Sequence, residues 1–267
     1  MKKIFSCIFL LLIISFGLKA QNPNQNKKSK REEKKKKINA IIKQEEEGII
    51  HYKTHWAGGF KLMNDGYGGF LEYAKAQSVK KSLLFQFEID ERKHSKELKL
   101  NSDYPNTSPL IFGKINFFYP VKLGVQKQYL LGNKGNRNGV AISCNFGGGV
   151  SLGLLRPYLY QVLLGDTATS FFSSDQVFYD TTSTGQNSLI GGPGLSQGWS
   201  KLKMTPGIYA KSALRFDYGR YNEIISAIEI GASVEYYAKK IPQMIEIKQN
   251  QMFLGLYVSL VFGNRKS

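Results

Sequence analysis

Alternation between apolar and polar residues recurs along the chain from His51 to the C-terminus. Successive side chains of a β-strand point to opposite faces, so a period of two indicates strands with one apolar and one polar face. The segment from Lys114 to Gln128 shows this pattern best. Its apolar face holds Ile115, Phe117, Tyr119, Val121, Leu123 and Val125, and its polar face holds Lys114, Asn116, Lys122, Gly124, Gln126 and Gln128.

The same pattern predicts eight strands. They span residues 54–63, 68–78, 82–91, 113–130, 138–154, 205–218, 223–238 and 250–263. An even number of antiparallel strands places both ends of the chain on one side of the sheet. The connections on that side are short, whereas three of the four on the other side are long, at 92–112, 155–204 and 239–249. This asymmetry is typical of outer-membrane barrels.

The sequence therefore predicts an all-β fold, an eight-stranded antiparallel transmembrane β-barrel. Residues 156–164 either extend a strand above the membrane or begin a ninth and a tenth strand. We expect an eight-stranded interior to be filled by side chains, which makes a general-diffusion pore a poor interpretation. The segment 165–204 is expected to be a long polar loop on the outer side.

The faces of the strands decide between two kinds of barrel. In a membrane barrel the apolar face points outward, and in a soluble, lipocalin-like ligand-binding barrel it points inward. The polar faces here mix Gly, Ser, Asn, Gln and Tyr with sparse charges, which favours the membrane barrel. The residues that we expect to face lipid in the last strand are Leu254, Leu256, Val258, Leu260 and Phe262.

Charged residues of both signs occur on adjacent predicted strands. Lys211, Arg215 and Asp217 lie in one strand, and the next strand contains Glu229 and Glu235. We expect them to pair across a narrow lumen, where each buried ion needs a partner. The alternative is a salt-bridge ladder on a soluble surface. Aromatic residues near strand ends are expected to form interfacial girdles; they are Trp56, Tyr119, Tyr129, Tyr218, Tyr221, Tyr236 and Tyr237.

The N-terminus has the organisation of a secretory signal peptide. Lys2 and Lys3 precede an apolar run that ends before Lys19 and Ala20, and cleavage is expected after Ala20. Residues 21–50 are then a basic flexible periplasmic extension with a short helix near Ile38, and residues 51–267 are the barrel. The protein is expected in the outer membrane of a Gram-negative cell envelope, with this extension and the C-terminus in the periplasm.

The formal net charge is +17, and residues 27–37 contribute +6 of it, with eight basic residues against Glu32 and Glu33. This run is either a solvated tail or a contact for anionic headgroups or the cell wall. It lacks interleaved aromatics, so nucleic acid is not an expected partner. The expected partners are outer-membrane lipid, lipopolysaccharide and other envelope proteins.

Catalytic chemistry has weak candidates. His94, Ser95 and Glu97 follow the third strand at its outer end, and a base beside a nucleophile is the minimum for ester cleavage. They make a lipid-modifying barrel enzyme of the esterase or acyl-chain class an alternative, although the segment ERKHSKE also fits a charged loop. His51 and His55 lack a nearby carboxylate pair, so no metal site is expected. No cofactor is expected either.

Several motifs resemble uncharacterised small outer-membrane β-barrel proteins of the Bacteroidota. They are Phe112–Tyr119 with Leu123–Gly124, Gln128–Gly132, Gly147–Gly149, and Ser151–Leu154 with Pro157–Tyr158. The resemblance covers about residues 50–263 and implies a location but no activity. The segment 255–262 is also similar to the C-terminal strand signal of barrel proteins, except that five residues follow the aromatic Phe262.

Overall fold

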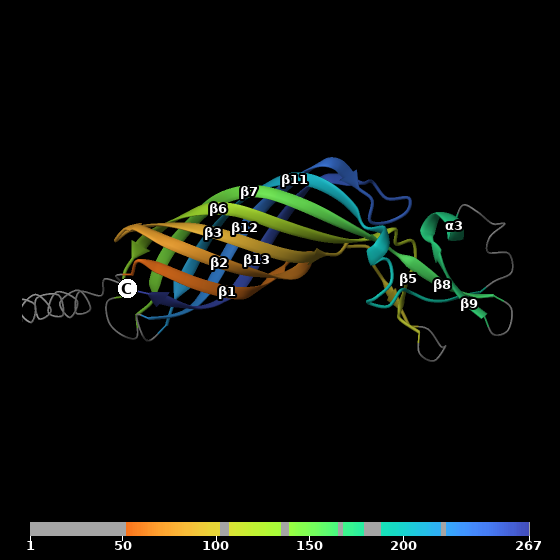
Figure 1. Cartoon of the computed structure of the whole chain (residues 1–267), viewed down its shortest axis with the longest axis horizontal. Helices are drawn as coiled ribbons and strands as arrows, with labels where there is room; N and C mark the ends of the chain where they lie inside the picture. Colours follow the sequence, from red (N-terminus) through yellow and green to blue (C-terminus); the bar gives the residue numbers. More distant parts are fainter. Residues whose placement is uncertain are drawn as a thin grey trace, which may run out of the picture. The chain divides into compact units, whose positions relative to one another are not determined.

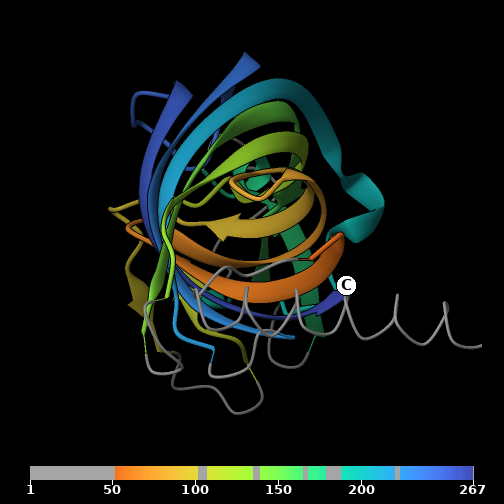
Figure 2. The ribbon, with the colours of Figure 1, turned by 90° about the vertical axis from the view of Figure 1, so that its left-hand side faces the viewer.

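Eight long antiparallel strands close into a barrel in the computed structural model, which describes residues 52–101, 107–134, 139–164, 168–178, 188–219 and 223–266. The barrel strands are β1 (Thr54–Met63), β2 (Gly66–Ser78), β3 (Lys81–Arg92), β6 (Asn116–Gly132), β7 (Ala141–Pro157), β11 (Lys203–Asp217), β12 (Ile224–Ile241) and β13 (Asn250–Lys266). Consecutive barrel strands pair with each other, and β1 pairs with β13 to close the ring (Figures 1 and 2). The predicted eight-stranded antiparallel barrel is confirmed.

The connections divide the barrel into two unlike ends. One end, called the terminal end below, carries Thr54, Lys266 and the connections 79–80, 133–140 and 218–223. The opposite end, called the loop end, carries the tight turn 64–65 and the long connections 93–115, 158–202 and 242–249. The predicted division into a short-turn side and a long-loop side is therefore present.

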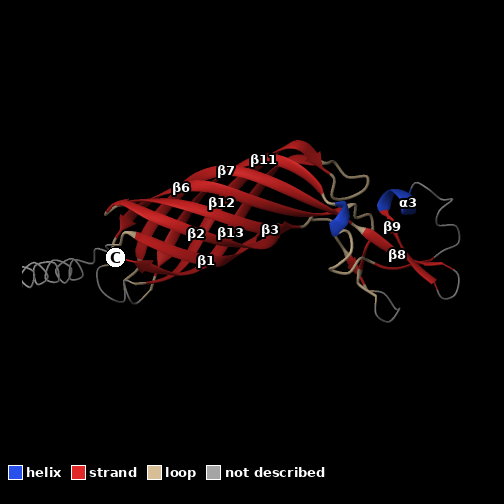
Figure 3. Cartoon of the chain, viewed as in Figure 1, coloured by secondary structure: helices blue, strands red, loops and turns tan. Residues whose placement is uncertain are grey.

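The loop end carries more structure than a long polar loop would. A second sheet consists of β8 (Leu159–Leu164), β9 (Ala168–Ser173) and β10 (Ser188–Gly191), in the order β10-β8-β9 (Figure 3). The helix α3 (Ser174–Phe178) follows β9, and the 3₁₀ turn η1 (Trp199–Lys201) follows β10. Two further short strands, β4 (Lys99–Leu100) and β5 (Leu110–Ile111), pair with each other. The strand β8 pairs with β9 and β10, outside the barrel, so the ten-stranded alternative is wrong.

A small hydrophobic core supports these outer elements. Ile111, Tyr158, Tyr160 and Val162 are buried together. The hydroxyl of Tyr158 accepts a hydrogen bond from the backbone N–H of Ile111 (2.8 Å), and burial raises its pKa to about 12. The hydroxyl of Tyr160 donates to the backbone carbonyl of Lys114 (2.9 Å). The expectation of a polar loop over 165–204 is thus wrong for residues 168–178 and 188–204, because apolar side chains within 158–162 give that segment a core to pack against.

Glycines on the inward faces make room for aromatic rings. A Cβ atom at Gly231 would lie 2.7 Å from the ring of Tyr257, which is buried on the neighbouring strand β13. An eight-stranded barrel is just wide enough for its own side chains, so a ring on one strand requires a missing side chain on the next. This explains why glycines share the polar faces of the strands.

Two of the sequence predictions lie outside the described residues: the signal peptide at 1–20 and the basic extension with its short helix at 21–50. No helix within the described part of the chain is long and apolar enough to cross a membrane.

Candidate functional site in the barrel interior

The distribution of polar and apolar side chains in the barrel is inverted relative to a soluble protein. In β13 the side chains of Leu254 and Leu256 are 64% and 69% exposed, whereas Tyr257 and Ser259 are buried. The other residues of the predicted lipid face, Val258, Leu260 and Phe262, are exposed as well. An apolar exterior around a polar interior is the arrangement that a membrane-spanning barrel requires.

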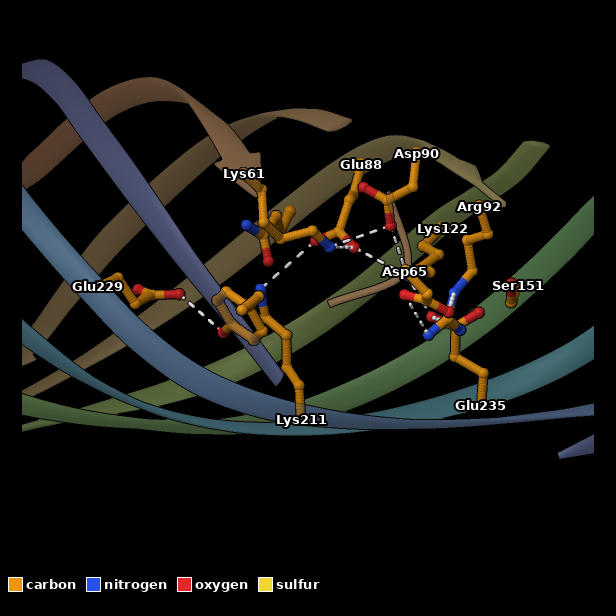
Figure 4. Close-up of polar contacts among 12 residues, drawn as sticks. Lys61, Asp65, Glu88, Asp90, Arg92, Lys122, Ser151, Lys211, Glu229 and Glu235 are labelled. Carbon is orange, nitrogen blue, oxygen red and sulfur yellow. Dashed lines mark hydrogen bonds and ion pairs between the residues drawn. The ribbon is translucent and has the colours of Figure 1, made fainter. Parts of the chain in front are cut away.

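The middle of the interior holds what we call the central cluster: Lys61, Glu88, Asp90, Lys122 and Lys211. The ammonium of Lys122 lies 2.9 Å from Glu88 Oε1 and 2.6 Å from Asp90 Oδ2. Lys61 pairs with the same two carboxylates, and Lys211 approaches Glu88 at 3.5 Å from the opposite wall. Figure 4 shows these side chains pointing toward one another from several strands. The cluster therefore connects both sides of the barrel.

An aromatic layer and a second ion group close the interior toward the loop end. Glu235 pairs with Lys122 (2.5 Å) and with Arg92 (3.1 Å), and it accepts a hydrogen bond from the Tyr237 hydroxyl (2.7 Å). Arg92 also pairs with Asp65 in the β1–β2 turn (2.8 Å). The buried rings and aliphatic chains packed beside this group are Phe118, Leu155, Tyr237 and Ile241, with Phe253 partly buried against them.

Toward the terminal end, Arg215 is the centre of a third group. Its guanidinium contacts both carboxylate oxygens of Glu72 at 2.5 and 2.8 Å and lies 2.6 Å from Glu229. Glu72 also contacts His55 Nε2 (3.2 Å), and Glu229 accepts from the Tyr257 hydroxyl (2.9 Å). A planar guanidinium suits such bidentate recognition of carboxylates.

The last ion group lies at the rim of the terminal end. Asp217 pairs there with Arg265 and with Lys134 from the β6–β7 connection. A small cavity of about 50 Å³ lies beside this group and is lined by residues that include Tyr52, His55 and Ser82. Its volume suits water rather than an organic ligand.

Within these four groups, each charge has an opposite partner. Seven cationic side chains face seven carboxylates in the ion pairs of these four groups within the described residues; they are Lys61, Arg92, Lys122, Lys134, Lys211, Arg215 and Arg265 against Asp65, Glu72, Glu88, Asp90, Asp217, Glu229 and Glu235. Breaking one buried ion pair leaves its remaining charge buried without a partner, so the network resists opening. The arrangement is suited to seal and rigidify the barrel.

The structure places the predicted lumen residues inside the barrel but distributes them over different groups. Arg215 pairs with Glu229, as neighbouring strands allow. Lys211 pairs with Glu88 rather than with either predicted glutamate, and Asp217 pairs with Arg265 and Lys134. Sequence reasoning missed the acids of β3 that anchor the central cluster. Their signal was present: Gln86, Glu88 and Asp90 alternate with apolar residues in the predicted strand 82–91.

The candidate catalytic residues His94, Ser95 and Glu97 form a tight turn at the loop end. Glu97 accepts from the backbone N–H of His94 (3.0 Å) and pairs with Lys114 (2.6 Å), while His94 Nδ1 accepts from the backbone N–H of Lys96 (3.2 Å). Burial lowers the pKa of the Lys114 ammonium, and the Glu97 carboxylate opposes that shift. Within this turn, no hydrogen bond joins the Ser95 hydroxyl to the His94 ring, which leaves the serine without a positioned base.

The remaining candidates have separate outcomes. His55 is a buried partner of Glu72, and His51 lies outside the described residues. The described residues contain no group of three His, Cys, Asp or Glu side chains placed to hold a metal ion.

The predicted aromatic girdle needs one correction. Trp56, Tyr218 and Tyr236 are exposed on the exterior. Tyr237 is instead fully buried inside the barrel, where its hydroxyl bonds to Glu235 and Ser151, because it shares the inward face of β12 with the glutamates. Tyr119 and Tyr129 are partly exposed, and Tyr221 lies outside the described residues.

Comparison with known proteins finds no matching family model and no matching curated protein. Among solved structures, the chain is similar to Ail, the attachment invasion locus protein of Yersinia pestis, at 12% identity over 80% of this chain and 99% of that chain, with a TM-score of 0.39. It is also similar to Neisserial surface protein A at 10% identity over 80% and 96% of the two chains, with a TM-score of 0.36. The outer membrane protein OprG from Pseudomonas aeruginosa matches at 11% identity over 80% and 96%, with a TM-score of 0.31. Likeness at this level carries no inference about function, which rests instead on the chain's own residues.

Proposed function

We propose that this protein is an outer-membrane β-barrel with a structural or protein-interaction role and no open pore. The observation that carries the proposal is the inverted barrel: apolar side chains such as Leu254 cover the exterior while ion pairs fill the interior. An exterior of this kind is unfavourable in water, since each buried apolar side chain gains about 1.5–3 kcal/mol over an exposed one. Lipid would provide apolar surroundings for the side chains on the exterior of the barrel.

A closed interior argues against transport and against the soluble alternative. The central cluster bridges opposite walls through Lys211 and Glu88, and the aromatic layer lies beside Glu235. A lipocalin-like barrel would need an apolar cavity for an apolar ligand, and this interior is filled by charged and polar side chains. The folded outer elements around Tyr158 then remain as the part of the molecule that is available for contacts.

The two unlike ends of the barrel support the proposed location. Barrels of the outer membrane keep short turns and both termini in the periplasm and long connections outside, which fits the terminal end and the loop end respectively. The signal-like segment 1–20 supports export, and the basic run 27–37 would then meet anionic headgroups or the cell wall. Lipopolysaccharide and envelope proteins are the partners that this placement favours, and membership in the Bacteroidota family stays a prediction.

Three measurements on the expressed protein test the proposal. Washing membranes with alkaline carbonate should leave it in the pellet of the outer-membrane fraction, and unheated samples should migrate faster on a denaturing gel than heated ones. In planar bilayers the purified protein should show no stable conductance. Release into the wash, or migration that heating does not change, would contradict the membrane barrel, and a steady open conductance would contradict the closed interior.

A further inference from the structure

One row of residues crosses the outward face of three strands near the loop end. Tyr119 on β6 pairs with Leu154 on β7, and Leu154 pairs with Met204 on β11. Gly207 pairs with Tyr237 between β11 and β12, and the exposed Lys240 follows three residues beyond Tyr237 on β12. The row therefore runs from an aromatic residue to apolar ones, and a lysine lies on the neighbouring strand.

The segment that precedes β11 folds back over this row and is fixed there. The buried guanidinium of Arg156 donates to the backbone carbonyl of Leu195 (2.9 Å) and lies 4.2 Å from the ring of Phe117 and 5.0 Å from that of Trp199. The indole of Trp199 stacks on Tyr119, with ring centroids 5.6 Å apart, and its N–H donates to Leu195 (2.6 Å). These contacts fix the segment in place at the rim of the barrel.

The fixed segment presents apolar and basic side chains together. Leu195 is 88% exposed, and Trp199 and Met204 are exposed beside it. Lys201 and Lys203 are exposed between them. We call these side chains, with Lys240, the rim patch.

The height of the rim patch relative to the apolar exterior identifies its surroundings. On β11 the outward apolar side chains run from Phe216 to Ile208, about the nine residues that a tilted strand needs to cross the hydrocarbon. Met204 continues this outward face four residues beyond Ile208, and Lys203, which pairs with the buried Leu155, is exposed at the rim where β11 begins. At roughly 3.3 Å per residue this places the lysines at headgroup level, where aromatic side chains also concentrate.

We propose that the rim patch binds the phosphate groups of a phosphorylated outer-leaflet lipid of the lipid A class. The inference rests on the membrane location proposed above. Lys201, Lys203 and Lys240 would meet the phosphates, and Leu195, Trp199 and Met204 would lie against the upper acyl chains. The acid nearest to Tyr119 in this row is Glu91 on β3, and it accepts a hydrogen bond from Tyr67 (2.7 Å). It lies at the end of the row that is opposite to the lysines.

A lipid-binding measurement on the full chain in detergent micelles tests the proposal. Bisphosphorylated lipid A is added, bound lipid is counted by native mass spectrometry, and dephosphorylated lipid A serves as the comparison ligand. The triple variant Lys201→Gln/Lys203→Gln/Lys240→Gln should bind the bisphosphorylated lipid roughly tenfold or more weakly, because each lysine near an anionic surface adds to the attraction. A single charge reversal, Lys240→Glu, should lower the affinity in the same direction.

A matched control removes equal charge from the other end of the barrel. Lys75, Lys80 and Lys266 are exposed lysines near the terminal end, and their joint replacement by Gln should leave binding unchanged. Equal losses in the two triple variants, or equal binding of the two lipids by the wild-type protein, would overturn the rim patch. The heat-dependent gel shift of each variant reports barrel formation separately, so a failure of the membrane proposal is distinguishable from a failure of this one.

The two tryptophans provide a second readout. With Trp56 replaced by Phe, the remaining fluorescence comes from Trp199, and its emission should shift to the blue when bisphosphorylated lipid A binds. The complementary variant Trp199→Phe leaves Trp56 near the terminal end, whose emission should not respond. A response from Trp56 alone would overturn the proposal.

Discussion

Removing Arg215 should destabilise the barrel more than almost any other single change. Its side chain is buried and compensates two carboxylates, Glu72 through two contacts of 2.5 and 2.8 Å and Glu229 at 2.6 Å. In Arg215→Met the side-chain length is nearly kept, but both carboxylates lose their main cation. His55 and Tyr257 remain beside them and cannot replace a full charge when the imidazole is neutral.

The magnitude follows from the number of charges left behind. Taking one partner from a buried ion pair costs about 3–5 kcal/mol because the remaining charge stays desolvated. We expect the free energy of unfolding of Arg215→Met to fall by at least about 3 kcal/mol. Urea unfolding of the protein in lipid vesicles, followed by tryptophan emission, measures this change as a lower midpoint at an unchanged slope.

Two further variants separate charge from packing. In Arg215→Met/Glu72→Gln/Glu229→Gln the two carboxylates are replaced by uncharged amides. Most of the lost stability should return, since replacing a complete buried ion group often leaves the free energy of unfolding unchanged. Lys75→Met removes an exposed charge at the terminal end and should change stability by less than about 0.5 kcal/mol. If the single variant lost under about 1 kcal/mol, or the triple variant were no more stable than the single one, buried charge compensation would not hold this barrel together.

The other expectations concern the lipid face, the interior seal, the extension and the candidate catalytic turn. Val258→Lys should reduce membrane insertion at a cost of about 2–4 kcal/mol while Val258→Leu has little effect, and equal heat-dependent gel shifts would refute the lipid-face assignment. Joint replacement of Glu88 and Lys122 by Ala should introduce a small ion conductance in planar bilayers, and an unchanged barrier would show that the central cluster does not seal the barrel. Deletion of residues 21–37 should leave the gel shift intact but weaken salt-sensitive retention on anionic cell-wall material, and unchanged retention at low salt would favour a merely solvated tail. His94→Ala should leave the acylation of lipid A unchanged by mass spectrometry, because the ring accepts a backbone hydrogen bond instead of holding a serine, and an altered acyl pattern would restore the enzyme hypothesis.

The barrel strands were predictable because their physics is local. Each strand alternates in the sequence, and the boundaries of β1 agree with the expectation to the residue. Partner choice inside the barrel was not predictable to the same depth. Arg215 and Glu229 are paired across neighbouring strands, so their contact follows from register, whereas Lys211 reaches Glu88 from the opposite wall. A contact across the lumen depends on the closed three-dimensional ring, which alternation does not encode.

The prediction for the loop end was wrong for a related reason. Tyr158 and Val162 alternate like a strand, and the sequence alone cannot say whether such a strand joins the barrel or leaves it. Pro157 ends β7, and β8 begins at Leu159 in another sheet. The residues that follow have a polar composition, which predicts a loop. A few buried aromatic residues are nevertheless enough to fix their fold, because Ile111 from the connection between β3 and β6 packs against them.

The ion groups also explain how the barrel keeps its register. A strand that slipped by one residue would turn its whole inward face outward. In β11 that slip would move Lys211 and Arg215 into the lipid and place Ile208 among the carboxylates of the interior. The penalty would include charged side chains in hydrocarbon, at about 2–4 kcal/mol for each Lys or Arg near the midplane, in addition to the stranded Glu72 and Glu229. The buried ion pairs therefore act against wrong pairings more than they add to the stability of the right one.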